Sequence, residues 1–155
     1  MTKNRLDFIS KHFSNYEIRL SEDDLIIFNP YGSENIRVEY VSDDEWTPYV
    51  IGFLFHRHHL SNEDDVIGHI KGITSGNVLS VEFSKNGVRC LGGYIESREA
   101  DGFSYEALAR FAARFGFAEL KDTADSLKVR GWQEGASFDA SFVIDSRGNV
   151  IVKKQ

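Results

Sequence analysis

Apolar residues recur every three or four positions in three segments of the chain, and this spacing predicts three amphipathic helices. The helices are expected over about residues 6–15, 61–76 and 104–115. Ser61 and Asp64 have the spacing of a capping box, and the acids after Ser61 favour the start of a helix. Gly76 and Gly116 are typical of the residues at which helices end.

Most of the remaining chain alternates apolar and polar residues, a period-two pattern that is typical of half-buried strands. Strands are expected over about residues 17–20, 25–28, 36–40, 46–58, 79–83, 88–95, 127–130, 138–144 and 150–152. The segment 50–55 is apolar at nearly every position, which predicts a strand in the middle of a covered sheet. Asn86 and Gly87 predict a tight hairpin turn, because both central positions of such a turn need a positive φ. Gly92 and Gly93 predict a bulge or a close backbone approach in the strand that follows.

Runs of strands broken by isolated helices are typical of the α+β class. We therefore expect an α+β fold with a mainly antiparallel sheet and about three helices. The chain has 155 residues, of which 41% are apolar and 27% charged, and both values are ordinary for a globular protein. This size predicts a single compact α+β domain that spans residues 1–155.

Cysteine content and apolar runs indicate the compartment. The lone Cys90 cannot form an internal disulfide, which favours a reducing environment, and it is expected to be a small buried residue of a hairpin strand. The longest apolar run, residues 49–55, is far shorter than the roughly 20 residues that span a bilayer. We therefore expect no membrane segment and a cytoplasmic location, the alternative being an effector exported by a route that the sequence does not reveal.

Charge is distributed unevenly along the sequence. Twelve acidic and three basic residues between Glu17 and Asp65 give this segment a net charge of −9, against −6 for the whole chain. A phosphate backbone would be repelled by such a surface, which argues against nucleic acid as a partner. Nine of the twelve acids form three clusters at predicted turns or helix starts: Glu22-Asp23-Asp24, Asp43-Asp44-Glu45 and Glu63-Asp64-Asp65.

The acidic clusters have three interpretations. One is a divalent-cation site, although no segment has the spacing of a calcium-binding loop. Turns and first helical turns collect Asp and Glu for local reasons, so the clusters can be a solvated surface. Alternatively, they form a docking face for a basic protein, with nearby aromatic residues as anchors. The residues expected to bind such a partner are Asp23, Asp24, Asp43, Asp44, Glu45, Trp46 and Tyr49, and Tyr31 is a further candidate anchor.

Histidines near the end of the predicted central strand suggest different chemistry. His56 and His58 are two residues apart, so in a strand they share a face and could bind one metal ion. A catalytic zinc site needs a third ligand, which His12, His69 or one of residues 63–65 would have to supply. The interpretation without a metal is that these histidines lie at a strand end, in solvent or beside neighbouring acids.

The usual motifs of hydrolases and nucleotide-dependent enzymes are missing from the sequence, which has no Gly-x-Ser-x-Gly and no phosphate-binding glycine loop. We therefore expect a small acidic, non-enzymatic binding protein without a cofactor. An example is an immunity-type inhibitor whose acidic face docks on a nuclease toxin, because enzymes that bind nucleic acid present basic surfaces. The alternatives are a metal-dependent enzyme that uses His56 and His58, and a ligand-binding or scaffold domain with a pocket near Phe111.

Overall fold

The computed structural model describes residues 2–41, 45–54, 56–97, 124–144, 146–147 and 150–154. These residues form two helices and ten strands. The helix expected over residues 104–115 lies outside the described residues. Of the two helices present there, neither is long and apolar enough to cross a bilayer.

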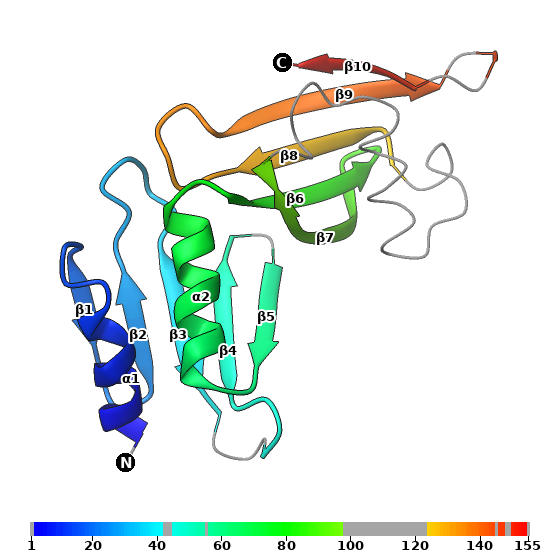
Figure 1. The fold of residues 1–155 in the computed structure, drawn as a ribbon. Helices are drawn as coiled ribbons and strands as arrows, with labels where there is room; N and C mark the ends of the chain where they lie inside the picture. The colour runs from blue at the N-terminus through cyan, green and yellow to red at the C-terminus, as the bar shows by residue number, and fades with distance from the viewer. Residues whose placement is uncertain are drawn as a thin grey trace.

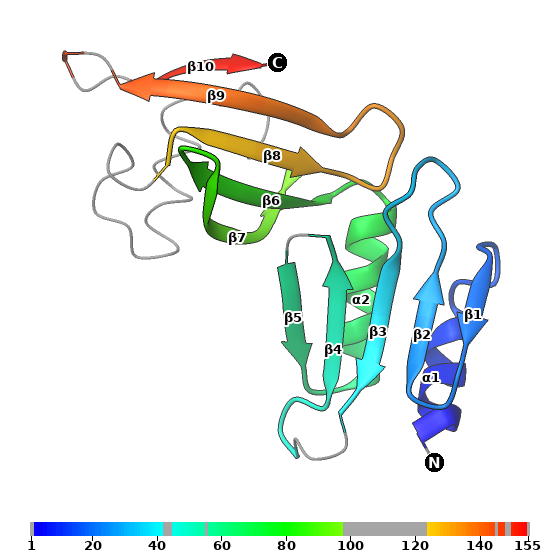
Figure 2. The ribbon, with the colours of Figure 1, turned by 180° about the vertical axis from the view of Figure 1, so that it is seen from behind.

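The first part of the chain forms a five-stranded antiparallel sheet, called sheet A here, with both helices on one of its faces (Figure 1). Its strands lie side by side in chain order, from β1 at one edge to β5 at the other. The elements are α1 (Thr2–Lys11), β1 (Ile18–Leu20), β2 (Asp24–Ile27), β3 (Ile36–Tyr40), β4 (Tyr49–Phe53), β5 (His56–Leu60) and α2 (Glu63–Thr74). Figure 2 shows the other face of sheet A, which neither helix covers.

The later strands form a second five-stranded sheet, sheet B, in the order β10-β9-β8-β6-β7. They are β6 (Val78–Lys85), β7 (Val88–Glu96), β8 (Ser126–Arg130), β9 (Phe138–Ile144) and β10 (Val150–Lys154). Every strand pairing in both sheets is antiparallel, so the α+β class and the antiparallel arrangement are confirmed. The described strands nevertheless divide into two sheets, where the pattern had predicted one.

Sheet A and its helices enclose the larger hydrophobic core. Alternate residues of β3 and β4 point toward the helices and are fully buried, as Val38 and Ile51 illustrate. Ile70 of α2 packs on them, and burial of each such side chain stabilises the fold by about 1.5–3 kcal/mol. Trp132, which follows β8 of sheet B, is fully buried in this same core. A smaller core covers one face of sheet B around Val81.

The segment predicted as one strand over residues 46–58 is a hairpin. β4 ends at Phe53, and His56 of β5 pairs directly with it. The chain reverses at Leu54, which has a left-handed φ of 55°. A leucine rarely adopts this conformation, so the sequence carries no turn signal there. The consequence is that the histidines lie on the edge strand β5. The apolar strand β4 is next to that edge, and the middle strand of the sheet is β3.

The β6–β7 hairpin confirms one local prediction and corrects another. Asn86 and Gly87 have φ values of 49° and 78°, as the predicted turn requires. Cys90 is exposed, although it was expected to be buried. The reason is a shift in register: Phe83 pairs with Leu91 and Ser84 with Arg89, which leaves Cys90 as the extra residue of a bulge. The bulge therefore lies at Cys90 and not at the two following glycines.

Candidate functional site

The strand connections bring the acidic clusters to one end of sheet A. Tyr40, the last residue of β3, pairs with Tyr49, and Tyr49 pairs with Leu60, the last residue of β5. The backbone amide of Tyr40 also donates to the carbonyl of Asp23 in the β1–β2 turn, at 3.2 Å. The β1–β2 turn, the β3–β4 loop and the start of α2 therefore lie at the same end, the lower end of sheet A in Figure 1.

We call this end of the molecule the acidic end and define it by its exposed carboxylates, which are Glu22, Asp23, Glu45, Asp64 and Asp65. Asp43 and Asp44, which precede Glu45 in the sequence, lie outside the described residues. In the part of the chain that the structure describes, none of the five carboxylates forms an ion pair. Carboxylates that have no cation to offset their charge give this end of the sheet a negative electrostatic potential.

Local capping explains part of the acidity at the start of α2. Asn62 is the N-cap, and its side-chain oxygen accepts a hydrogen bond from the backbone amide of Asp65 at 2.9 Å. The cap is thus one residue later than the capping box predicted. Glu63, Asp64 and Asp65 occupy the first turn, where negative charge interacts favourably with the helix dipole.

Tyr49 has a structural role at this end of the sheet. Its hydroxyl donates a 2.5 Å hydrogen bond to Oε1 of Glu63, and Nη1 of Arg5 lies 3.6 Å from the same oxygen. Burial, followed by the Glu63 contact, raises the pKa of the Tyr49 hydroxyl. Tyr49 is fully buried, so the expectation that it anchors a partner is wrong. The alternation in β4 directs it into the core beneath the acidic end.

Trp46 is the exposed aromatic residue of the acidic end. It follows Glu45 in the β3–β4 loop, and 85% of its surface is accessible. Tyr31 is also exposed, but it lies in the β2–β3 loop at the opposite end of sheet A. Of the three aromatic candidates, Trp46 alone combines exposure with a position beside the acidic clusters.

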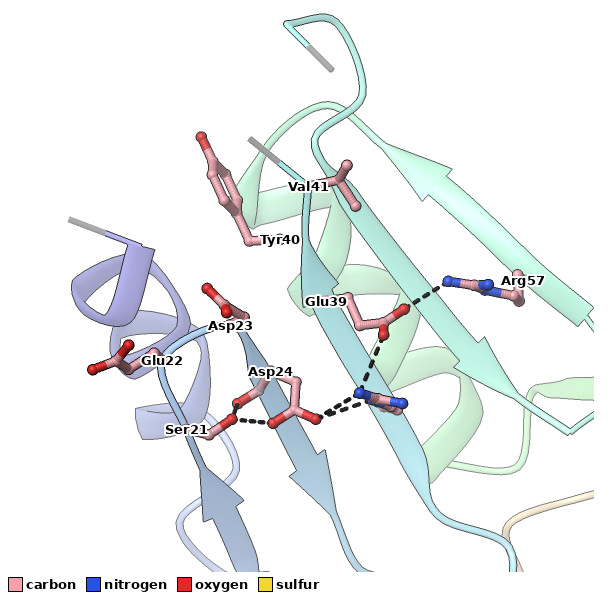
Figure 3. Close-up of a pocket in the computed structure, with 9 residues that line it drawn as sticks. Ser21, Glu22, Asp23, Asp24, Glu39, Tyr40, Val41 and Arg57 are labelled. Carbon is pink, nitrogen blue, oxygen red and sulfur yellow. Dashed lines mark hydrogen bonds and ion pairs between the residues drawn. The ribbon is translucent and has the colours of Figure 1, made fainter. Parts of the chain in front are cut away.

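A groove of about 850 Å³ begins at the acidic end and extends over the uncovered face of sheet A (Figure 3). Its lining residues come from the β1–β2 turn, from β2, β3 and β5, and from the start of the β3–β4 loop: Ser21, Glu22, Asp23, Asp24, Arg37, Glu39, Tyr40, Val41 and Arg57. The register explains this set, because Asp24 pairs with Glu39 while Arg37 and Arg57 both pair with Gly52. Side chains at these positions point to the face without helices.

Ion pairs connect the charged residues on the floor of the groove. Arg37 contacts Asp24 at 2.9 Å and Glu39 at 3.2 Å, and Arg57 contacts Glu39 at 2.6 Å. The hydroxyl of Ser21 donates to Oδ1 of Asp24, and this bond, with the nearby Arg37 guanidinium, lowers the pKa of Asp24. The negative charge of Asp24 is therefore offset by Arg37 within the protein. Asp23 beside it is exposed and has no ion pair among the described residues. The sequence had indicated neither of the two arginines.

The histidines lie away from the acidic end, on β5. His56 pairs with Phe53 and His58 with Ile51, and the position of His58 faces the helix-covered side of sheet A. The His58 ring stacks on His69 of α2 with 5.2 Å between centroids, and His69 contacts Tyr94 of β7 edge-on at 4.7 Å. Among the described residues no three His, Cys, Asp or Glu side chains are grouped to hold a metal ion. The side chain of His56 is outside the described set, and the metal site stays a prediction.

Comparison with known proteins does not assign a function. No family model, curated protein or solved structure matches the chain. The pocket expected near Phe111 lies outside the described residues. The geometry of the acidic end and its groove therefore provides the evidence for function.

Proposed function

We propose that the chain is a small, non-enzymatic binding protein whose acidic end docks on a basic surface of another protein. The observation that carries this proposal is the convergence at one end of sheet A of acidic clusters that are far apart in the sequence. Local preference for acids at turns accounts for each cluster, but it does not require that the clusters share an end. Five exposed carboxylates there form no ion pair within the described residues, and Trp46 is exposed among them.

The chemistry of such a surface favours rapid and selective association with a positive partner. Opposite potentials steer the two proteins together, and the same field repels acidic proteins and nucleic acid. A basic partner of this kind is an enzyme with a phosphate-binding cleft, such as a nuclease toxin, which an acidic protein would inhibit by occupying the cleft. Trp46 would supply the apolar contact that interfaces commonly place among their charges.

The test compares two triple variants that have the same net charge. Asp23→Lys, Glu45→Lys and Asp64→Lys reverse charges at the acidic end. Glu17→Lys, Glu34→Lys and Glu134→Lys reverse the same number of charges elsewhere. Partners are captured from the host lysate at low salt and purified, and their association rates with each protein are measured against ionic strength.

The proposal predicts a basic partner that the wild type and the second variant capture and the acidic-end variant does not. For that partner, the acidic-end variant should associate at least ten-fold more slowly at low salt, with a flatter dependence on salt. Equal behaviour of the two variants, or capture of no basic protein by the wild type, contradicts the proposal. Circular dichroism of both variants confirms that each is folded.

A further inference from the structure

We infer that the groove over sheet A receives a basic segment of the partner protein, which places a lysine or arginine side chain between Asp23 and Val41. This inference rests on the proposed function and identifies the part of the acidic end that makes the central contact. The rest of the acidic end would then steer the partner, while the groove holds it.

The ion pairs inside the groove indicate the charge of the ligand that it would bind. The guanidinium groups of Arg37 and Arg57 are bound by Asp24 and Glu39, and these four residues form a continuous chain of ion pairs along the sheet. The other two charged lining residues, Glu22 and Asp23, have no such partner among the described residues. The groove therefore carries an excess of two negative charges at the end where it opens. A ligand that complements it is positively charged.

The shape and the apolar surface of the groove favour a basic side chain over a small cation. Val41 is 40% exposed and lines the groove together with these carboxylates, whereas the ring of Tyr40 packs on Tyr49 at the edge of the core. Figure 3 shows the ion pairs along the strands and Glu22, Asp23 and Tyr40 toward the strand ends. Lysine and arginine have a long aliphatic stem and a charged head, so the stem can contact Val41 while the head meets Asp23.

The size of the groove fits a segment of several residues. Its volume of about 850 Å³ lies in the upper part of the range for binding sites of small ligands. The groove lies over the face of sheet A that neither helix covers (Figure 2), so an extended segment can lie across β2 and β3 without displacing a helix. The ion pairs on its floor also present guanidinium and carboxylate groups to the polar backbone of such a segment.

The experiment uses a hexa-arginine peptide as the probe and two matched double variants. Glu22→Gln with Asp23→Asn neutralises the groove carboxylates. Glu45→Gln with Asp64→Asn makes the same chemical changes at the acidic end outside the groove. Peptide binding to the wild type and to both variants is followed by amide chemical shifts in nitrogen-15 NMR spectra at low salt.

We expect the peptide to shift the amide signals of residues 21–24 and 39–41 most strongly. The groove variant should bind it at least five-fold more weakly, and the matched variant less than two-fold more weakly. Equal weakening in both variants overturns the groove as the central contact but leaves the acidic end as a cation-binding surface. Absence of binding to the wild type overturns this inference, while partner capture by the triple variants still tests the proposed function separately.

Discussion

The side-chain amide of Asn29 donates a 3.2 Å hydrogen bond to the backbone carbonyl of Trp132, although the two residues are 103 positions apart. Asn29 follows β2 of sheet A, whereas Trp132 follows β8 of sheet B. The indole ring of Trp132 is fully buried in the core of sheet A, where it contacts Phe53 and Tyr16. This bond and this ring connect the two sheets through the interior of the protein.

Asn29→Ala should lower the free energy of unfolding by about 1–3 kcal/mol, because it leaves a buried carbonyl without its donor. Trp132→Ala should cost about 3–5 kcal/mol through the cavity it creates. Urea unfolding at pH 7 measures both losses. Asn77→Ala, at an exposed position, is the control and should change stability by less than about 0.5 kcal/mol. A loss for Asn29→Ala no larger than the control would show that this hydrogen bond does not stabilise the fold.

Tyr49→Phe removes the hydroxyl that joins β4 to α2. We expect stability at pH 7 to fall by about 1–2 kcal/mol, since a bond to a charged acceptor is lost while Arg5 still contacts Glu63. Tyr31→Phe, at an exposed tyrosine, is the matched control and should have little effect.

The pH dependence of the same variant tests the raised pKa of Tyr49. A tyrosine with a raised pKa stabilises the fold below its ordinary pKa of about 10, and this contribution is lost as pH rises further. The difference in stability between wild type and Tyr49→Phe should therefore narrow above pH 10. Thermal unfolding between pH 7 and 11 measures this difference in stability. A difference that stays constant over this range would contradict a raised pKa for the Tyr49 hydroxyl.

Asp24→Asn tests the lowered pKa of this carboxylate. The bonds from Ser21 and Arg37 favour its charged form, so its contribution to stability is present above the ordinary pKa of about 4 and lost below it. Because Arg37 is exposed, the contribution at pH 7 should be less than about 1 kcal/mol. Urea midpoints of wild type and variant should differ at pH 7 and converge toward pH 3. Urea midpoints that diverge on acidification would mean that the fold raises the pKa of Asp24 and does not lower it.

Trp46→Ala tests the aromatic contact of the acidic end. Trp46 is 85% exposed, so its removal should leave the melting temperature almost unchanged. The affinity of the Trp46→Ala variant for a captured basic partner should fall about ten-fold or more, as expected for a residue at the centre of an interface. Tyr31→Ala, at the other end of sheet A, should leave the affinity unchanged. If the two variants bind equally well, Trp46 is not part of the interface.

Local signals in the sequence were sufficient to predict many of the elements. The Asn86-Gly87 turn was predictable because few residue pairs tolerate two successive positive φ values. The strand at residues 36–40 was predictable because its alternation matches the buried and exposed faces of β3. In both cases the physical constraint acts within a few neighbouring residues.

Features that depend on distant contacts were not predictable in this way. The reversal at Leu54 has no glycine, asparagine or proline to mark it, and it determines which residues lie beside β4. Only that reversal brings Arg57 close to Glu39. The burial of Tyr49 depends on the helices that cover its face of the sheet. Clusters of acids at turns were evident from the sequence, but their common location follows from the order of the strands.

The acidic residues that we propose to bind a partner lie in the connections of sheet A, apart from the residues that form its core. Residues 21–23 and 45–46 are exposed, whereas the side chains that hold sheet A to its helices come from the strands and helices themselves. Exchanging these short connections for others of different charge or length should therefore redirect the protein to new targets on an unchanged framework. Under the proposed function, sheet A is in this respect a framework for engineering, with exchangeable loops at one end and a core formed by other residues.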